Sequence, residues 1–275
     1  MDTKKWLPIA VVVVVVGLVA VWLMQSKKSN PTDQNQTQQQ PKQTSQEPTK
    51  TVKLSSKQNM GNFLVDAKGM TLYYFPKDFI NKSNCPLGPC LTAWPVFYSA
   101  DTVVSLPLNK VDFGQITRDD GAMQSTYKGW PLYYYFKDTQ PGDTLGEGVG
   151  NIWYIVPEPF YTVMMQNQES IGSNYLSDAK GMTLYSFTND KQGTSNTPPQ
   201  SKCTDQCLAA WPVFYTSSII IPSLLKNTDF TSFKRSDGAN QLAYKGSPLY
   251  YYASDTKSGD IKGQGFNKVW FVVKP

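Results

Sequence analysis

Cysteine is the first residue type in this chain whose spacing could do chemistry. Cys85 and Cys90 bracket Pro-Leu-Gly-Pro, and Cys203 and Cys207 bracket Thr-Asp-Gln. Each pair could close a short disulfide loop, or all four sulfurs could hold one metal ion. Neither spacing is Cys-x-x-Cys, and the two pairs lie far apart in the sequence. We therefore predict two local disulfides, Cys85–Cys90 and Cys203–Cys207, which imply an oxidising compartment.

The sequence contains no histidine. This absence removes Ser-His-Asp and Cys-His nucleophiles, histidine-ligated zinc and blue copper from consideration. A phosphate-binding loop and a dinucleotide-binding glycine fingerprint are missing as well. Two carboxylates could still hydrolyse a glycoside, but the candidates Asp119 and Asp120 are adjacent and precede Gly121, which is typical of a turn. We predict no catalytic residue, no metal and no cofactor, and therefore a non-catalytic role.

An aspartate ends each of four copies of the phrase Lys-Gly-x-x-Leu-Tyr-x-(Phe/Tyr)-x-x-Asp. Such a carboxylate could accept a cation or sugar hydroxyls, or it could cap a loop or bond the repeated tyrosine hydroxyl. Active sites rarely come in four copies, so the recurrence favours the structural role. The repeated residues of the phrase are Tyr73, Phe75, Asp78, Tyr133, Tyr135, Asp138, Tyr185, Phe187, Asp190, Tyr250, Tyr252 and Asp255.

Two further groups of residues could bind a ligand. The glycine-rich stretches Gly142–Gly148 and Gly259–Gly265 resemble backbone cradles for an ion, although tight turns also explain them. Exposed tryptophan and tyrosine rings form stacking platforms for sugars or peptides, whereas buried rings would form a β core. We name Trp130, Tyr134 and Tyr251 as the candidate ligand platform.

These residues belong to two long repeats. Asp66–Tyr73 returns as Asp178–Tyr185, and Trp94–Tyr98 returns as Trp211–Tyr215. Each long repeat contains two phrases, and Trp130 is one position where the second copy differs, because Ser247 stands there. The second copy also carries extra loop residues around 193–201. Self-similarity at this period indicates a repeat architecture.

The repeats read as β structure because Tyr, Phe, Val and Thr suit a pleated, half-buried surface. Alternation puts Tyr73 and Phe75 on one face of a strand and Leu72 and Tyr74 on the other. One short helix per repeat is predicted, at 90–93 and 207–210, each stopped by the Trp-Pro that follows. The predicted fold is all-β, with two tandem repeats that each have an internal pseudo-twofold. A four-bladed propeller is the alternative.

The N-terminal part of the chain has a different composition. Residues 6–24 are apolar and uncharged, and they are about long enough to cross a bilayer core of roughly 30 Å. A cleaved signal peptide is the alternative, but no small-x-small cleavage site follows. We predict a cytoplasmic N-terminus (1–5), a transmembrane anchor (6–24), a disordered Gln/Thr/Lys/Pro-rich linker (25–57), β repeat 1 (58–160) and β repeat 2 (161–275).

The positive charge of the chain lies before the repeats. Residues 1–57 carry eight lysines against Asp2, Asp33 and Glu47, which accounts for the whole formal net charge of +5. The repeats are therefore close to neutral, and a nucleic-acid partner is not predicted. Flanking lysines leave the orientation of the anchor undecided, whereas the predicted disulfides favour a C-terminal part outside the cytoplasm.

Three motifs resemble the secreted-repeat lipoprotein family of prokaryotes. They are the Tyr-x-aromatic-x-x-Asp phrase, the Cys…Cys-Leu-x-Ala-Trp-Pro stretch, and Arg-x-Asp-Gly…Tyr-Lys-Gly-x-Pro-Leu-Tyr, which begins at Arg118 and again at Arg235. The resemblance covers nearly all of 60–275 and implies export and surface display. The lipobox cysteine of that family is missing, and the predicted anchor stands in its place. The family has no established function, so the resemblance supplies no catalytic residue.

We therefore expect a membrane-anchored, extracytoplasmic binding or interaction protein of the cell envelope, single-pass, with its C-terminal ectodomain outside. Its expected partners are the lipid bilayer, through residues 6–24, and a glycan or protein of the envelope. Two alternatives stay open: a metal- or thiol-dependent redox or enzymatic accessory, and a structural spacer.

Overall fold

The computed structural model of the chain describes residues 51–275. The predicted cytoplasmic segment, the predicted anchor and most of the predicted linker lie outside the described residues. Between 51 and 275, no helix is long and apolar enough to cross a membrane. Residues 51–275 fall within one structural unit. We call 51–160 the first repeat, with halves 51–108 and 109–160, and 161–275 the second repeat, with halves 161–225 and 226–275.

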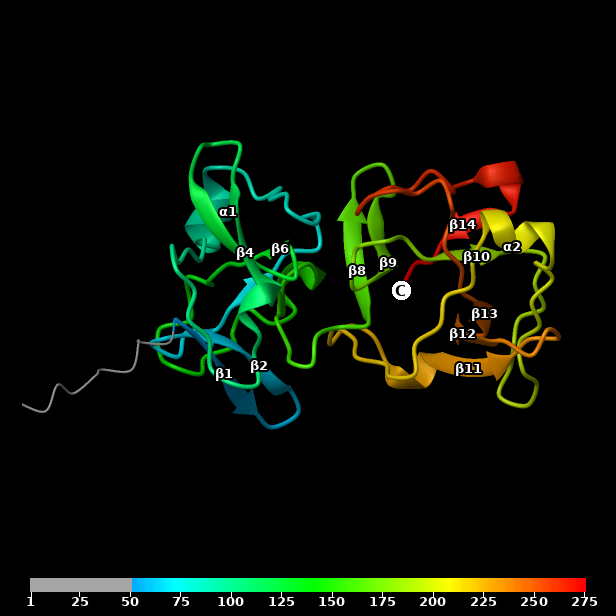
Figure 1. The fold of residues 1–275 in the computed structure, drawn as a ribbon, viewed down its shortest axis with the longest axis horizontal. Helices are drawn as coiled ribbons and strands as arrows, with labels where there is room; N and C mark the ends of the chain where they lie inside the picture. The colour runs from blue at the N-terminus through cyan, green and yellow to red at the C-terminus, as the bar shows by residue number, and fades with distance from the viewer. Residues whose placement is uncertain (1–50) are drawn as a thin grey trace, which may run out of the picture. The chain divides into compact units, whose positions relative to one another are not determined.

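Each half begins with an antiparallel hairpin of two strands (Figure 1). The hairpins of the first repeat are β1 (Val52–Lys57) with β2 (Gly61–Asp66), and β4 (Phe113–Thr117) with β5 (Met123–Tyr127). Those of the second repeat are β8 (Val163–Gln168) with β9 (Ser173–Asp178), and β11 (Phe230–Lys234) with β12 (Asn240–Tyr244).

Shorter strands follow the hairpins. β3 (Tyr73–Tyr74) pairs with β7 (Tyr154–Ile155), β6 (Trp130–Pro131) with β5, β10 (Tyr185–Phe187) with β14 (Trp270–Val272), and β13 (Ser247–Pro248) with β12. The α-helices are α1 (Pro89–Ala93) and α2 (Gln206–Ala210), and the 3-10 helices are η1 (Lys110–Asp112), η2 (Val149–Asn151), η3 (Asn227–Asp229) and η4 (Phe266–Lys268). The predicted mostly-β fold with tandem repeats and two short helices is confirmed. The sheets of 51–275 have two or three strands each and form no closed propeller.

The predicted disordered linker ends too late in the sequence. Its last residues form β1, in which Val52 is fully buried and Leu54 packs against the core. β1 pairs along its whole length with β2, and the Ser105 N–H donates to the Val52 carbonyl. The polar composition of 25–57 hid this strand because only two of its side chains reach the core. The first repeat therefore begins before the predicted boundary at 58.

In each repeat, a segment of each half hydrogen-bonds with the other half. Val156, from the second half of the first repeat, donates to Leu72 (3.2 Å) and accepts from Leu64 (2.9 Å), both from the first half. Phe97, from the first half, accepts in the same way from Ser125 (2.9 Å) of the second half. The second repeat makes the matching bonds through Val273 with Leu176 and Leu184, and through Phe214 with Leu242 and Leu249. Each half therefore provides backbone partners for the other.

The strand that carries the phrase is buried on both faces. Tyr73 and Phe75 enter an aromatic cluster confined to the first repeat. Leu72 and Tyr74 enter a larger cluster that also contains Met164 and other residues of the second repeat. The alternation seen in the sequence therefore separates a core private to one repeat from a core that the two repeats share.

Candidate functional site

The tyrosine and the aspartate of the repeated phrase pair across the two halves of a repeat. The Tyr73 hydroxyl donates to Asp138 (2.6 Å), and the Tyr133 hydroxyl donates to Asp78 (2.7 Å). The second repeat has the same bonds, Tyr185 to Asp255 (2.6 Å) and Tyr250 to Asp190 (2.7 Å). All four phrase carboxylates therefore accept tyrosine hydroxyls, which leaves them engaged within the fold.

Asp78 is the most deeply placed of these carboxylates. It is fully buried, and it accepts the Asn84 N–H (2.5 Å) as well as the Tyr133 hydroxyl. Burial raises the pKa of Asp78 to about 8, although the two hydrogen bonds and the charge of Arg118 lower it. A carboxyl group with such a pKa is largely protonated at neutral pH, because burial disfavours its charged form.

The raised pKa of Asp78 makes stability depend on pH. The folded state holds a proton that the unfolded chain releases above its ordinary pKa of about 4, so the contribution to stability is complete below that pH. We expect the free energy of unfolding to fall as pH rises from about 4 to about 8, through the folded pKa. Asp78→Asn removes the titration and keeps the acceptor for Asn84, so it should flatten this part of the curve. Urea unfolding of both proteins across that range checks the difference, and parallel curves would count against a raised pKa.

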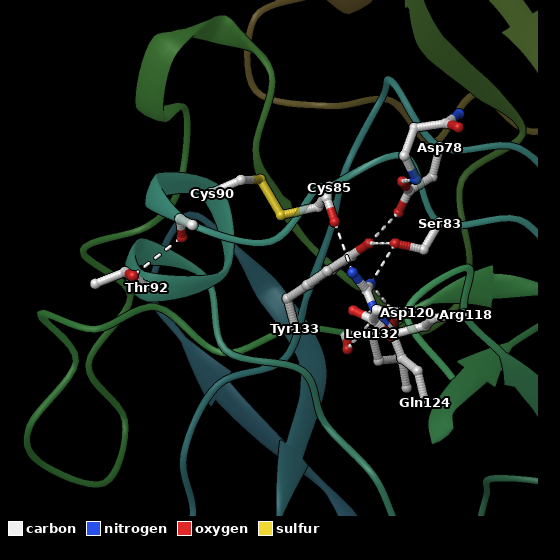
Figure 2. The surroundings of a disulfide bond; sticks show 12 residues. Asp78, Ser83, Cys85, Cys90, Thr92, Arg118, Asp120, Gln124, Leu132 and Tyr133 are labelled. Atoms are coloured by element: carbon white, nitrogen blue, oxygen red, sulfur yellow. Dashed lines mark hydrogen bonds and ion pairs between the residues drawn. A yellow bond between two sulfur atoms is a disulfide. The ribbon is translucent and has the colours of Figure 1, made fainter. Parts of the chain in front are cut away.

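Arg118 connects the phrase to the disulfide loop (Figure 2). Its guanidinium, which is buried, donates to the Cys85 carbonyl (2.6 Å), to the Gln124 side chain (2.9 Å) and to Ser83. It also pairs with Asp120, at 3.2 Å. Asp120 is therefore engaged with this arginine, and the neighbouring Asp119 carboxylate pairs with Lys82. Arg235 makes the same contacts in the second repeat, with Cys203, Gln241, Ser201 and Asp237.

The predicted disulfides Cys85–Cys90 and Cys203–Cys207 are confirmed. No cysteine between 51 and 275 remains free, so these sulfurs offer neither a thiol nor a thiolate ligand. A loop as short as that between Cys85 and Cys90 is worth about 2 kcal/mol of unfolded-state entropy when closed. Each disulfide fixes the loop that leads into α1 or α2.

Four rings stack in a row beside each disulfide. In the first repeat the order is Phe75, Trp153, Trp94 and Tyr135, with centroid separations of 4.1, 3.8 and 4.2 Å. The second repeat has Phe187, Trp270, Trp211 and Tyr252, at 4.3, 3.8 and 4.2 Å. The four rings of the first repeat are buried. These phrase aromatics therefore form a core in this structure.

Trp130 does not provide an exposed platform, and the prediction that its ring is exposed is wrong. The ring is fully buried, its Nε1–H donates to the Ala179 carbonyl of the second repeat (3.0 Å), and it packs edge-on against Tyr74. The equivalent Ser247 is half-buried and does not lie between the two repeats. Trp130 thus joins the two repeats.

Tyr134 and Tyr251 occupy equivalent places in separate repeats. Each ring is half-buried, and its hydroxyl donates at 3.0 Å to Asp66 or Asp178 respectively. The structure therefore does not bring Trp130, Tyr134 and Tyr251 together into one surface.

The glycine-rich stretches serve the phrase tyrosines. Gly146 lies so close to Tyr73 and Trp94 that a Cβ would approach those rings to 2.8 and 3.0 Å. The nearby Asp143 carboxylate accepts two N–H groups of its own loop, both at 2.9 Å. Residues 51–275 contain no group of three or more acidic, histidine or cysteine side chains arranged for a metal ion. We find tight turns packed on the aromatic core at these positions.

A cleft between the two repeats is the candidate site that the sequence did not reveal. Its volume is about 1160 Å³. The first repeat lines it with 79–82, with 111–114 and with the turn around Lys128, and the second repeat lines it with 179–182 and 256–260. We call this space the inter-repeat cleft. It is an open groove with apolar walls, which is the usual form of a ligand site.

A smaller pocket lies at the same place in the second repeat, and a loop forms one of its walls. There the floor residues Thr228, Asp229, Thr231, Lys245 and Gly246 correspond to Val111, Asp112, Gly114, Lys128 and Gly129. Residues 193–199 line this pocket together with the floor, and its volume is about 570 Å³. The Gly193 N–H donates to the Gly246 carbonyl (2.8 Å), as Asn81 donates to Gly129 (2.8 Å) in the first repeat.

The difference between the two places comes from loop length. Strand-like bridges close the loop at Phe79–Lys82 in the first repeat and at Lys191–Gln200 in the second. Only Ile80 and Asn81 lie between the first pair, whereas 192–199 lie between the second. The extra loop residues recognised in the sequence are therefore the ones that cover the floor, and the short loop leaves the inter-repeat cleft open.

The inter-repeat cleft carries an excess of positive charge. Lys82, Lys128, Lys180 and Lys257 line it, together with two aspartates. Asp112 is paired with Lys128 (2.9 Å). Among residues 51–275, Lys180 and Lys257 form no ion pair, so their charges are available to a ligand.

Comparison with known proteins bears on this architecture. A family model described as a secreted repeat of unknown function matches residues 55–98, 114–157, 174–215 and 231–274. Each match begins within the opening hairpin of one of the four halves. No curated protein matches the chain, and no solved structure matches it either. The resemblance drawn from the motifs is thus confirmed over most of the chain, which belongs to this family of secreted repeats of unknown function.

Proposed function

We propose that this chain is a non-catalytic binding protein of the cell envelope, which holds its ligand in the inter-repeat cleft. The repeats stand outside the cytoplasm, and residues 6–24 anchor them as a single membrane span with 25–51 as a tether. Membership of a secreted family and two disulfides support the extracytoplasmic location. The apolar, uncharged composition of 6–24 supports the anchor.

The open cleft is the observation on which the proposal rests. The two repeats share their hydrogen bonds and their aromatic stack. They differ at one place, where the first repeat borders the inter-repeat cleft and the second repeat carries the longer loop 193–199. The remaining chemistry of the repeats is engaged within the fold, because the phrase carboxylates accept tyrosine hydroxyls and the sulfurs form disulfides. Between 51 and 275, no cysteine is present as a free thiol.

Exchanging the two loops tests this function. In the first variant, Ile80–Asn81 are replaced by the sequence of 192–199, which should cover the cleft. In the matched control, 192–199 are replaced by Ile-Asn, which shortens the other loop and leaves the cleft open. Each full-length tagged protein is expressed in the membrane of its native cell and cross-linked to neighbouring envelope components. The tagged protein is then purified, and the components that are attached to it are identified.

We expect the wild type and the control to retain the same envelope component, and the covered variant to lose it. Equal retention by all three proteins would place binding elsewhere, and no retention by the wild type would support the structural spacer. Because the longer loop could disturb the repeat interface, Gly114→Trp with Thr126→Ala provides a second way to fill the floor. Intact disulfides and an unchanged unfolding midpoint establish that each variant is folded.

A further inference from the structure

We infer that the inter-repeat cleft binds an extended acidic segment of a partner protein, with apolar side chains between its carboxylates. This inference rests on the proposed function and specifies its ligand. The inference is based on the charges, the ion-paired aspartates and the apolar side chains of the cleft.

Two of the cleft lysines are absent from the equivalent positions of the other repeat. Lys82 corresponds to Gln200 in the second repeat, because both residues end the bridged loop. Lys257 corresponds to Gln140, in the first repeat, which does not line the cleft. At these two positions, the residue that lines the cleft is lysine and its equivalent in the other repeat is glutamine. A positive surface of this kind attracts a negative partner and excludes a positive one.

Both aspartates of the cleft are held in ion pairs through one carboxylate oxygen. Asp260, which is buried, accepts from the Lys262 ammonium (2.8 Å) and from the Thr256 N–H (2.8 Å). Asp112 is paired with Lys128. The charged acceptors for sugar hydroxyl groups are therefore partly engaged, whereas the ammonium groups of Lys180 and Lys257 form no ion pair within residues 51–275. The cleft instead presents donors, which suit the carboxylates of an acidic ligand.

Apolar side chains form part of the wall of the cleft. The Phe79 ring lies against Gly259, where a Cβ would come within 2.3 Å of it, and Met182 faces the same space. Val111 is 83% exposed. Methionine and exposed aliphatic side chains are typical of surfaces that receive the apolar side chains of a peptide. A sugar or polyol-phosphate polymer would gain little from them.

The linker of this chain is a poor occupant of its own cleft. Residues 25–57 carry six lysines against two acidic residues, so the cleft lysines repel them. We therefore assign the occupant to another protein.

Selection from a random peptide library on the full-length protein in nanodiscs tests the inference. We expect enriched peptides to alternate Asp or Glu with Leu, Ile, Val or Phe. Synthetic forms of these peptides are then titrated against the wild type, Lys180→Glu/Lys257→Glu, and Lys226→Glu/Lys234→Glu. The last variant has the same net charge as the second, but its exposed lysines lie outside the cleft.

The cleft reversal should weaken peptide binding about tenfold or more, and the control by less than about twofold, because only cleft charges contact the ligand. Binding should also weaken as salt is added. Enriched peptides without acidic residues, or acidic peptides equally sensitive to both variants, would overturn the inference. A polyol-phosphate polymer that binds in a cleft-dependent way while no peptide does would overturn the peptide and leave the proposed function standing. Failure of every ligand in the loop exchange would instead contradict the function itself.

Discussion

Trp130→Ala is expected to lower the free energy of unfolding by about 3–5 kcal/mol, because it removes a large, fully buried ring from a packed core. The ring belongs to the core that both repeats share, and its Nε1–H donates to the Ala179 carbonyl of the second repeat. The cost should therefore include looser coupling of the repeats, which appears as a broader or divided urea transition.

Two variants isolate the cause of that loss. Trp130→Phe keeps much of the packing and removes the hydrogen bond, so it should cost less than the alanine variant. Ser247→Ala changes the equivalent, half-buried position of the second repeat and should stay within about 0.5 kcal/mol of the wild type. An alanine variant at position 130 that costs under about 1 kcal/mol would mean that the repeats do not depend on a shared core.

Arg118→Ala is expected to cost about 1–3 kcal/mol for each buried acceptor that loses its hydrogen bond to the guanidinium. The variant deprives the Cys85 carbonyl and the Gln124 side chain of their guanidinium donor, and it leaves Asp120 without its ion pair. Arg118→Lys should recover only part of the loss, since an ammonium group cannot reproduce the geometry of the guanidinium fork.

The second repeat and the surface provide controls for Arg118. Arg235→Ala should cost a similar amount, because its contacts are the same. Lys110→Ala breaks an exposed pair with Asp101 and should change stability by less than about 1 kcal/mol. Urea unfolding at one pH with both disulfides intact compares all four proteins. An Arg118→Ala protein as stable as the Lys110→Ala protein would show that the buried network contributes little.

Local patterns in the sequence predicted the features that depend on neighbouring residues. The spacing of Cys85 and Cys90 predicted their disulfide, because two cysteines this close in the sequence can pair locally and their spacing is not Cys-x-x-Cys. Trp-Pro predicted where α1 ends, since proline disfavours helical geometry in the residue before it. Alternation assigned Tyr73 and Tyr74 to opposite faces, as the structure has them.

Features that depend on distant segments escaped the sequence. Alternation could not reveal that the second repeat covers Trp130, because the sequence alone does not distinguish a buried aromatic ring from an exposed one. Two roles were also left open for Asp78, since its tyrosine partner comes from the other half of the repeat. The inter-repeat cleft was missed for the same reason. The extra loop at 193–199 was visible as additional residues, but only the fold shows which floor it covers.

The reciprocal exchange of strands and of tyrosine–aspartate pairs has a consequence for how such chains can grow. A single half would expose one strand edge without its Val156 or Phe97 equivalent, and its buried carboxylate would lack a hydroxyl donor. The smallest unit that satisfies these hydrogen bonds is therefore a pair of halves. We expect such chains to gain repeats as pairs of halves, because an additional single half would lack its hydrogen-bond partners and would be less stable.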